Sequence, residues 1–353
     1  MSKILTYSEI DRQQWSELVR TSETGTWFQS PEAYDFFASL PELMEPFAVG
    51  VACSPESDSG QIDERLCAVC VGYVTKERNP IKQFFTRRAI ITGGPAIADD
   101  CTEDEVYTLM HAVCQRLKIE DCRLKISRGP IYIETRNFND FSPWKEAFET
   151  AGFAYQPHLN FHVDTSTNNL SENRKRQLKK SDAITELAIS ELEIQEWYKV
   201  LTELYRTKVK TPLWPIEFFL EAYRQGIAKF LLVKHEGRVI GGSMVVCDGV
   251  KELKSERVKG GTVYEWFECG LNAEYKDQYP SVMATYAGIQ LAKEIGCKRY
   301  DMMGAGEPGV PYGVRDFKAE FGGKLVEHGR FLCVTKPLLY KIGTIGIKIL
   351  KRK

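Results

Sequence analysis

The residues best suited to chemistry lie between Arg299 and Gly323, in the sequence RYDMMGAGEPGVPYGVRDFKAEFGG. A short strand, a loop rich in glycine and proline, and a short helix from about Tyr312 are predicted there. The helix carries Phe317 and Lys318. When an amine attacks an ester or thioester carbonyl, negative charge develops on the oxygen, and a positioned ammonium stabilises it. Lys318 is therefore a candidate catalytic residue, although a surface lysine beside a core phenylalanine is the common alternative.

Such a reaction also needs a group that takes a proton from the attacking amine. Glu268 is one candidate, because it lies in the otherwise apolar segment TVYEWFECG. Asp99 and Asp100, which follow the segment ITGGPAIA, are the others. The alternative for each is a strand-end cap or a solvated charge.

The alternation of side chains along a strand predicts which residues of TVYEWFECG line a site. Trp266 and Glu268 are expected to share one face of this strand, and Glu265 and Phe267 the other. Trp266 is accordingly a candidate for binding substrate, with a core tryptophan as the alternative.

Two basic segments are candidates for contacts with phosphate or substrate. SENRKRQLKK, from Ser171 to Lys180, contains Arg174 and Arg176, which could hold a diphosphate or a nucleic-acid backbone. YRTKVKTPLWP contains Arg206 and Lys210 in a predicted substrate-binding loop. A solvated helix face is the alternative for the first segment.

The elements that must position these residues alternate between helix and strand in both halves of the chain. The first half is expected to contain helices at 12–21, 31–40, 103–119 and 143–151 and strands at 46–53, 65–74, 88–97, 122–128 and 155–164. The second half is expected to contain helices at 171–183, 193–208, 215–225 and 281–295 and strands at 229–237, 238–249, 262–270 and 298–304. This order predicts a mixed α/β (α+β) protein with an internal structural duplication.

Length and composition limit the number of domains and the classes of function that this chain could have. A chain of 353 residues suits two domains, expected at 1–163 and 164–335, followed by a basic tail at 336–353. The net charge of −1 gives no global field for nucleic acid or membrane. Cys67 and Cys70 form a CxxC in an apolar strand without a second such motif, so we expect no metal site. No N-terminal apolar segment indicates export, and a cytoplasmic location is expected.

The tail KPLLYKIGTIGIKILKRK is basic and amphipathic. Leu338, Ile342, Ile345 and Ile349 form one helical stripe, and the tail has six Lys or Arg residues and no acid. This pattern is typical of a helix that lies on a membrane surface. A terminal helix packed on the protein is the alternative.

Several segments together resemble the FemABX family of peptidoglycan-bridge aminoacyltransferases. They are TWFQSPEAY, ITGGPAIADD, FHVDTSTNNLSENRKRQLKKSD, RVIGGSMVV, ATYAGIQLAKEIGCKRYDMMG and YGVRDFKAEFGGKLVEHGRF. The resemblance implies two tandem GNAT-like (acyl-CoA N-acyltransferase) domains with mixed sheets flanked by helices. It also implies that Lys318 lies near the acyl carbonyl and that Phe317 shapes the donor channel, with Tyr312 and Arg315 in the same motif expected to bind substrate.

The function that the resemblance implies is transfer of an activated aminoacyl group, from aminoacyl-tRNA, to an amine of a peptidoglycan or other cell-envelope precursor. No cofactor is expected. One alternative is an acyl-CoA-dependent N-acyltransferase acting on an amino sugar or amino acid. The strand at 262–270 is followed by NAEYKDQYPSVM, without the glycine-rich turn that holds a coenzyme A pyrophosphate. A noncatalytic protein that binds an envelope precursor is the other alternative.

Overall fold

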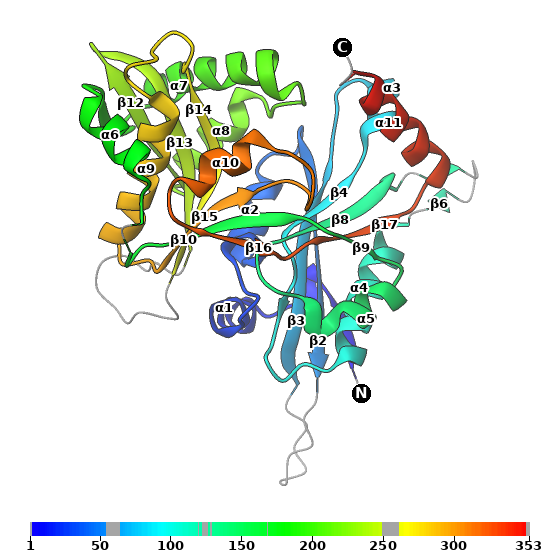
Figure 1. Ribbon diagram of the computed structural model, residues 1–353. Helices are drawn as coiled ribbons and strands as arrows, with labels where there is room; N and C mark the ends of the chain where they lie inside the picture. The colour runs from blue at the N-terminus through cyan, green and yellow to red at the C-terminus, as the bar shows by residue number, and fades with distance from the viewer. Residues whose placement is uncertain are drawn as a thin grey trace. The chain divides into compact units, whose positions relative to one another are not determined.

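The chain forms two units in a computed structural model, which describes residues 2–53, 64–118, 120–121, 126–127, 129–167, 169–248 and 261–350 (Figure 1). Unit 1 comprises residues 1–157 and 328–353, and unit 2 comprises residues 158–327. The boundaries expected from the sequence, after 163 and 335, fall six and eight residues later. The difference arises because the strands next to these boundaries pair across them, as described below.

Unit 1 contains an eight-stranded mixed sheet. Seven strands lie in the order β1 (Lys3–Thr6), β2 (Met44–Cys53), β3 (Arg65–Thr75), β4 (Ala89–Gly93), β8 (Tyr132–Asn137), β17 (Arg330–Val334) and β9 (Ala154–Gln156), and β5 (Ala96–Ile97) pairs with β3. The helices are α1 (Arg12–Thr21), α2 (Pro31–Ala38), α3 (Pro80–Thr86), α4 (Glu103–Leu117), α5 (Lys145–Thr150) and α11 (Pro337–Leu350). A separate pair consists of β6 (Glu120–Asp121) and β7 (Ile126–Ser127), and most of the strand expected at 122–128 lies outside the described residues.

Unit 2 contains a seven-stranded mixed sheet. Its strands lie in the order β11 (Ile184–Leu187), β12 (Ala228–His235), β13 (Arg238–Asp248), β14 (Thr262–Gly270), β15 (Arg299–Gly304), β10 (Leu159–Asp164) and β16 (Lys324–Glu327). Its helices are α6 (Glu172–Lys180), α7 (Glu191–Leu204), α8 (Ile216–Arg224), α9 (Pro280–Glu294) and α10 (Gly313–Ala319), and a π-helical turn, η4 (Tyr205–Val209), follows α7.

The two sheets have the same sequence of pairings. In each, three antiparallel pairs are followed by one parallel pair, β4–β8 or β14–β15, and then by two antiparallel pairs. In each sheet, the strand next to the parallel pair, β17 or β10, lies at one end of its unit's sequence and not between its two neighbours in the sheet. β10 directly follows the strands of unit 1 but pairs with β15 and β16, whereas β17 follows unit 2 but pairs with β8 and β9.

Local sequence explains where several helices begin. Ser30 caps α2 by accepting a hydrogen bond from the backbone N–H of Ala33, and Pro31 occupies the first helical position. Thr102 and Glu105 form a capping box at the start of α4. These signals were visible in the sequence, and α1 and α4 begin at the expected residues.

The parallel pair of unit 2 is short. β14 pairs with β15 only over Thr262–Tyr264, although β14 continues to Gly270. In unit 1 the equivalent pair, β4–β8, extends over all five residues of β4. The second part of β14 therefore runs beyond its pairing with β15, and it carries the predicted site residues of this strand.

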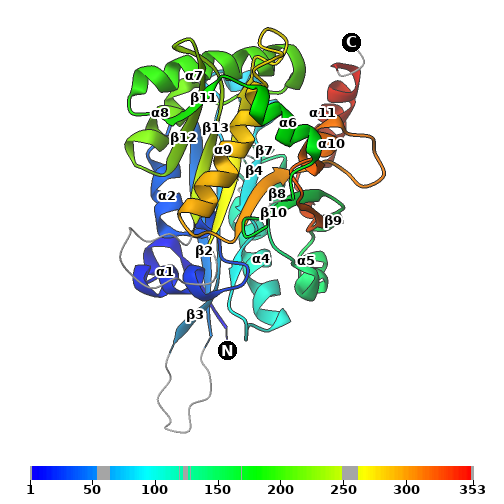
Figure 2. The same ribbon diagram turned by 60° about the vertical axis from the view of Figure 1, so that its left-hand side comes forward.

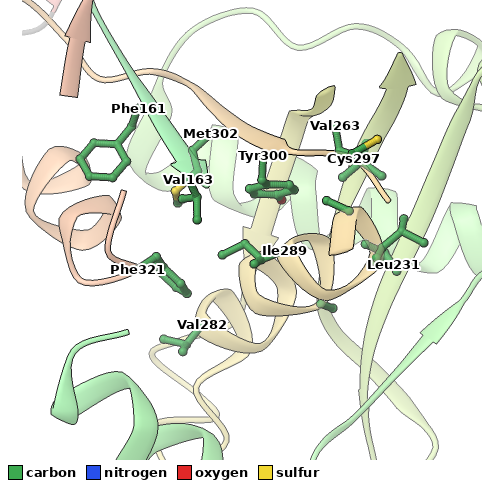
Figure 3. Close-up of a cluster of buried hydrophobic side chains, with 14 of the residues drawn as sticks. Phe161, Val163, Leu231, Val263, Val282, Ile289, Cys297, Tyr300, Met302 and Phe321 are labelled. Atoms are coloured by element: carbon green, nitrogen blue, oxygen red, sulfur yellow. The ribbon is translucent and has the colours of Figure 1, made fainter. Parts of the chain in front are cut away.

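Helices cover the two faces of the unit 2 sheet, with α9 on one face (Figure 2) and α7 and α8 packed on the other. The core beneath α9 includes Val263, Tyr300 and Met302 from the strands and Val282 and Ile289 from the helix (Figure 3). Burial of these apolar side chains is the main source of stability for such a sheet. This packing also determines on which face of the sheet the polar residues of β14 and β15 lie next to α9.

None of the described helices has both the length and the apolar composition required to cross a membrane.

The contact between α9 and Tyr300 gives a direct test of this packing. A Cβ at Gly288 of α9 would collide with the Tyr300 hydroxyl, whereas one at Gly343 of α11 would meet nothing within 4 Å. Alanine ordinarily stabilises a helix interior relative to glycine, by about 1 kcal/mol. Gly288→Ala should instead lower the free energy of unfolding by about 2 kcal/mol, the usual cost of overpacking. Chemical denaturation of both variants measures this, and Gly343→Ala should show no loss. Equal stability of the two variants would contradict the packing.

Candidate functional site

Lys318 is buried near the end of α10. Its Nζ donates hydrogen bonds to the backbone oxygen of Gly304, at 2.8 Å, and to that of Met302, both at the end of β15. Between them, Met303 has a φ of +61°, a left-handed conformation that is strained for a residue with a side chain. Backbone strain of this kind concentrates at functional sites. The interpretation of Lys318 as a surface lysine is wrong.

Arg174 supports the helix that carries Lys318. Its guanidinium lies 4.5 Å from the centre of the Phe317 ring and 5.1 Å from that of Phe321. It also donates to the backbone oxygen of Phe317 at 3.3 Å and lies 3.6 Å from the Glu320 carboxylate. Burial lowers the pKa of Arg174. Apart from a hydrogen bond to Gln177 of its own helix, these contacts are with α10 and the two residues after it, and contact of Arg174 with substrate stays a prediction.

A β-bulge changes which residues of β14 share a face. β13 pairs with Glu265 and then with Phe267, so Trp266 is an extra residue on β14. Glu265 and Glu268 consequently lie on the same face. Trp266 and Phe267 both pack against Phe218 of α8, with ring centroids 5.2 and 6.3 Å apart. The expected pairing of Trp266 with Glu268 on one face is wrong, because it assumed an unbroken strand.

The face shared by Glu265 and Glu268 is buried and acidic. Oε1 of Glu265 accepts hydrogen bonds from the hydroxyls of Thr285 and Tyr300, both at 2.9 Å. Burial raises the pKa of Glu265. Oε1 of Glu268 is also buried, and it has no hydrogen-bond partner among the described residues. Burial, and next the charge of Glu265, raise the pKa of Glu268 to about 8.

Three carboxyl groups compensate the Lys318 ammonium. Burial lowers the pKa of Lys318, and the charges of Glu265, Asp301 and Glu268 oppose that shift. Asp301 is fully buried, and one carboxylate oxygen lies 3.2 Å from Nε2 of His162. Burial acts to raise the pKa of Asp301, but interactions with His162 and other neighbours outweigh burial and lower it. This lysine–carboxyl cluster, consisting of Lys318, Glu265, Glu268, Asp301 and His162, can hold a buried positive charge and exchange a proton near neutral pH.

Tyr312 is the N-cap residue of α10, and Arg315 lies in the first turn of this helix. The Arg315 guanidinium donates to the backbone oxygens of Ala305, Glu307 and Val310, at 2.9, 2.6 and 3.2 Å. Arg315 thereby closes the glycine- and proline-rich loop on itself, which fixes the entry to α10. The Tyr312 side chain is exposed.

Four other predicted site residues are exposed. The contacts that the described residues show join none of them to the lysine–carboxyl cluster. Arg206 pairs with Glu203, Arg176 donates to Asn173, Lys210 lies at the end of η4, and Asp99 lies in unit 1. Their roles stay predictions. A hydrogen bond with Ser281 and the charge of Lys318 lower the pKa of Glu268 against the effect of burial, and the charge of Lys208, in the same segment as Arg206, adds a smaller effect in the same direction.

Sequence reasoning missed Glu265 as a site residue, and it missed Asp301, His162 and Tyr300. A usable signal was present for two of them. Glu265 and Asp301 are acidic residues within the apolar strand sequences TVYEWFECG and RYDMMG. An acidic side chain on a buried strand requires a compensating partner, which directs attention to Lys318.

Unit 1 contains a group that could hold a metal ion. The Cys53 and Cys67 thiols and a Glu105 carboxylate oxygen lie within 4.8 Å of one another. Oε2 of Glu105 already accepts hydrogen bonds from Thr102. Burial raises the pKa of Cys53, and a hydrogen bond with Cys101, followed by burial, raises that of Cys67. Because thiols bind metals as thiolates, these shifts oppose binding at neutral pH, and we assign no metal to this group.

The raised pKa of Glu268 predicts a pH dependence of stability. The folded protein keeps a proton on Glu268 up to about pH 8, whereas the unfolded chain releases it near 4.5. Stability from this group is therefore complete below pH 4.5 and declines as the pH rises to about 8. Glu268→Gln should remove this decline, which amounts to about 1 kcal/mol per pH unit at most.

Urea denaturation from pH 5 to pH 9 provides the measurement, with the exposed Glu294→Gln as the matched control. The stability difference between Glu268→Gln and the unsubstituted protein should grow in favour of the variant as the pH rises. A constant difference across this range would show that Glu268 ionises normally.

Comparisons with known proteins identify a family match in the second half of the chain and relatives of the same fold. The model of the FemAB family matches residues 258–347, which include the described parts of β14, β15, α9 and α10. The crystal structure of FemX superposes with a TM-score of 0.64 at 12% identity, covering 96% of this chain and 99% of FemX.

Two further solved structures share the fold. L-PGS from Bacillus licheniformis has a TM-score of 0.52 at 12% identity, covering 97% of each chain. A tandem GNAT protein from the clavulanic acid biosynthesis pathway has a TM-score of 0.53 at 10% identity, covering 94% of this chain and 98% of that one. No curated protein matches this chain in sequence. The chain is therefore FemABX-like, with a tandem GNAT-like fold and a FemAB family match that contains Glu265, Glu268, Asp301 and Lys318 of the lysine–carboxyl cluster.

Proposed function

We propose that the protein is an aminoacyltransferase that moves an activated aminoacyl group from aminoacyl-tRNA to an amine of a peptidoglycan or other cell-envelope precursor. The observation that carries this proposal is the buried Lys318 ammonium beside Glu268, a carboxyl group with a pKa near 8 and an unpartnered Oε1. The FemAB family match over the same segment supports it.

Lys318 is the group that stabilises the developing oxyanion. An ammonium has three N–H donors, and the backbone oxygens of Met302 and Gly304 take two of them. These two hydrogen bonds hold the nitrogen in place, and the third N–H is the one that contacts the acyl oxygen. A fixed positive charge in a site shielded from water stabilises the transition state without reorganisation.

Glu268 is the group that accepts the proton of the attacking amine. A general base works best when its pKa lies near the working pH and near that of the group it deprotonates. A carboxylate of ordinary pKa would be too weak a base for an amine, and burial against Glu265 corrects this. Its buried Oε1 gives the amine an acceptor that no described residue occupies.

The N-terminus of α9 argues against coenzyme A as the donor in unit 2. A pyrophosphate needs free backbone N–H groups at a helix N-terminus. Pro280 at the first position has no N–H, and the N–H of Ser281 donates to the Asn272 side chain at 3.2 Å. This leaves fewer donors than a coenzyme A site requires.

Removal of the ammonium tests the role of Lys318. Lys318→Met should reduce kcat by about a hundredfold, the scale of one transition-state charge contact, with little change in KM. It should also lower stability by about 3 kcal/mol, because it leaves buried carboxyl groups uncompensated. Transfer from charged tRNA to a nucleotide-linked muramyl peptide is the assay, and the exposed Lys324→Met is the control.

Lys318→Gln separates catalysis from folding, because an amide can still donate to both backbone oxygens but carries no charge. Unchanged turnover in a folded Lys318→Gln protein would refute the catalytic role. Heat stabilisation by acyl-CoA alone, with none by charged tRNA or muramyl peptide, would move the assignment to acyl-CoA-dependent transfer.

A pH–rate profile tests the role of Glu268. In the unsubstituted protein kcat/KM should rise as the pH increases toward about 8, because Glu268 accepts a proton only when ionised. Glu268→Gln should lower kcat/KM by about a hundredfold or more and remove this rise. A variant that keeps the same profile would assign the base elsewhere.

A further inference from the structure

The short helix α3 exposes three large apolar side chains. Ile81 is 73% exposed, and the neighbouring Phe84 and Phe85 are 44% and 52% exposed. Scattered exposed apolar residues are normal on a protein surface, but three on one seven-residue helix form a continuous patch. Burial of this patch requires a partner.

The helix α11 extends the same kind of surface. Leu338 is 72% exposed, and Ile342 and Ile345 are each 51% exposed. These are the members of the predicted apolar stripe whose side chains the structure describes. On another side of α11, the Tyr340 ring contacts that of Tyr132 in β8, with centroids 5.5 Å apart. The helix thus contacts the protein through Tyr340, whereas its apolar stripe stays half or more exposed.

The two helices meet where α11 begins. Nζ of Lys336 lies 5.8 Å from the centre of the Phe84 ring, and burial, followed by the charge of Arg87 at the end of α3, lowers the pKa of Lys336. Both helices belong to unit 1. The exposed apolar residues of α3 and α11 therefore flank the contact between Lys336 and Phe84, and we refer to them together as the α3–α11 surface.

The segments that contain the two helices are rich in basic residues, of which Arg87 pairs with Glu45 at 3.0 Å. Residues 76–88 contain five Lys or Arg and one acid, Glu77, which pairs with Lys82 at 2.9 Å. Residues 336–353 contain six Lys or Arg and no acid. A second copy of the chain would bring like charges together across the patch. A partner must instead combine an apolar interior with a negatively charged surface.

We propose that the α3–α11 surface docks on an anionic lipid bilayer. Amphipathic helices with apolar residues on one side and Lys or Arg along the edges bind in the plane of the lipid head groups. The apolar side chains enter the head-group region, and each nearby basic residue adds about 1 kcal/mol of attraction to an anionic membrane. This inference stands independently of the proposed reaction.

Vesicle co-sedimentation of the full-length protein tests the proposal. The protein should bind vesicles of phosphatidylglycerol mixed with phosphatidylcholine, should bind pure phosphatidylcholine weakly, and should dissociate at high salt. Ile81→Glu and Leu338→Glu should each reduce the binding constant by about tenfold. Leu192→Glu is the matched control, because Leu192 on α7 is 65% exposed but lies outside the surface, and it should bind like the unsubstituted protein.

Circular dichroism checks that each variant is folded, and Ile81→Ser and Leu338→Ser provide milder substitutions. Equal binding to neutral and anionic vesicles would overturn the proposal, as would variants that bind as tightly as the unsubstituted protein. Analytical ultracentrifugation supplies a further outcome. A dimer that Ile81→Glu dissociates, without any vesicle binding, would assign the surface to a second copy of the chain and overturn the lipid proposal.

Discussion

The hydrogen bonds from the buried Lys318 ammonium to the end of β15 organise the second unit. They join α10 to the backbone oxygens of Met302 and Gly304. The loop between β15 and α10 is held in place by the hydrogen bonds of Arg315 to its backbone oxygens. A buried ammonium is stable only with nearby negative charge, which Asp301 supplies and which Glu265 and Glu268 increase when they ionise. The position of the helix, the closure of the loop and the ionisation of the carboxyl groups therefore depend on one another, and none is set by a single residue.

The bulge at Trp266 places Glu265 and Glu268 on the same face of β14. In an unbroken strand, Glu268 would face the aromatic layer of α8, where the rings of Phe218 and Phe219 pack against each other. The extra residue turns Glu268 to the α9 side, next to Glu265, and gives the aromatic layer two consecutive residues of β14 instead. A change of one residue in register thus separates an apolar core from a polar site on opposite faces of the same strand.

Much of the fold could be predicted from the sequence, and the reasons are local. Caps such as Ser30 and Thr102, the glycine stop at Gly322 and the apolar strands gave clear signals, and the family resemblance gave the tandem fold. The site was only half predictable. Lys318 and Glu268 carried a chemical signal, but the bulge depends on how β14 pairs with β13, and strand pairing is a property of distant segments. The exposed strand β11, ITEL, was missed for the same reason, because only its pairing with β12 makes it a strand.

The exchange of β10 and β17 has a consequence for the order in which the protein can form during synthesis. Sheet positions beside β8 and β9 are filled by residues 330–334, which leave the ribosome only after all of unit 2 has been made. The unit that is translated first is therefore completed last, and until then it keeps two unpaired strand edges that are prone to aggregation. Unit 2 has no such delay, because β10 precedes the rest of its strands. A nascent chain of this architecture matures from its second half back to its first.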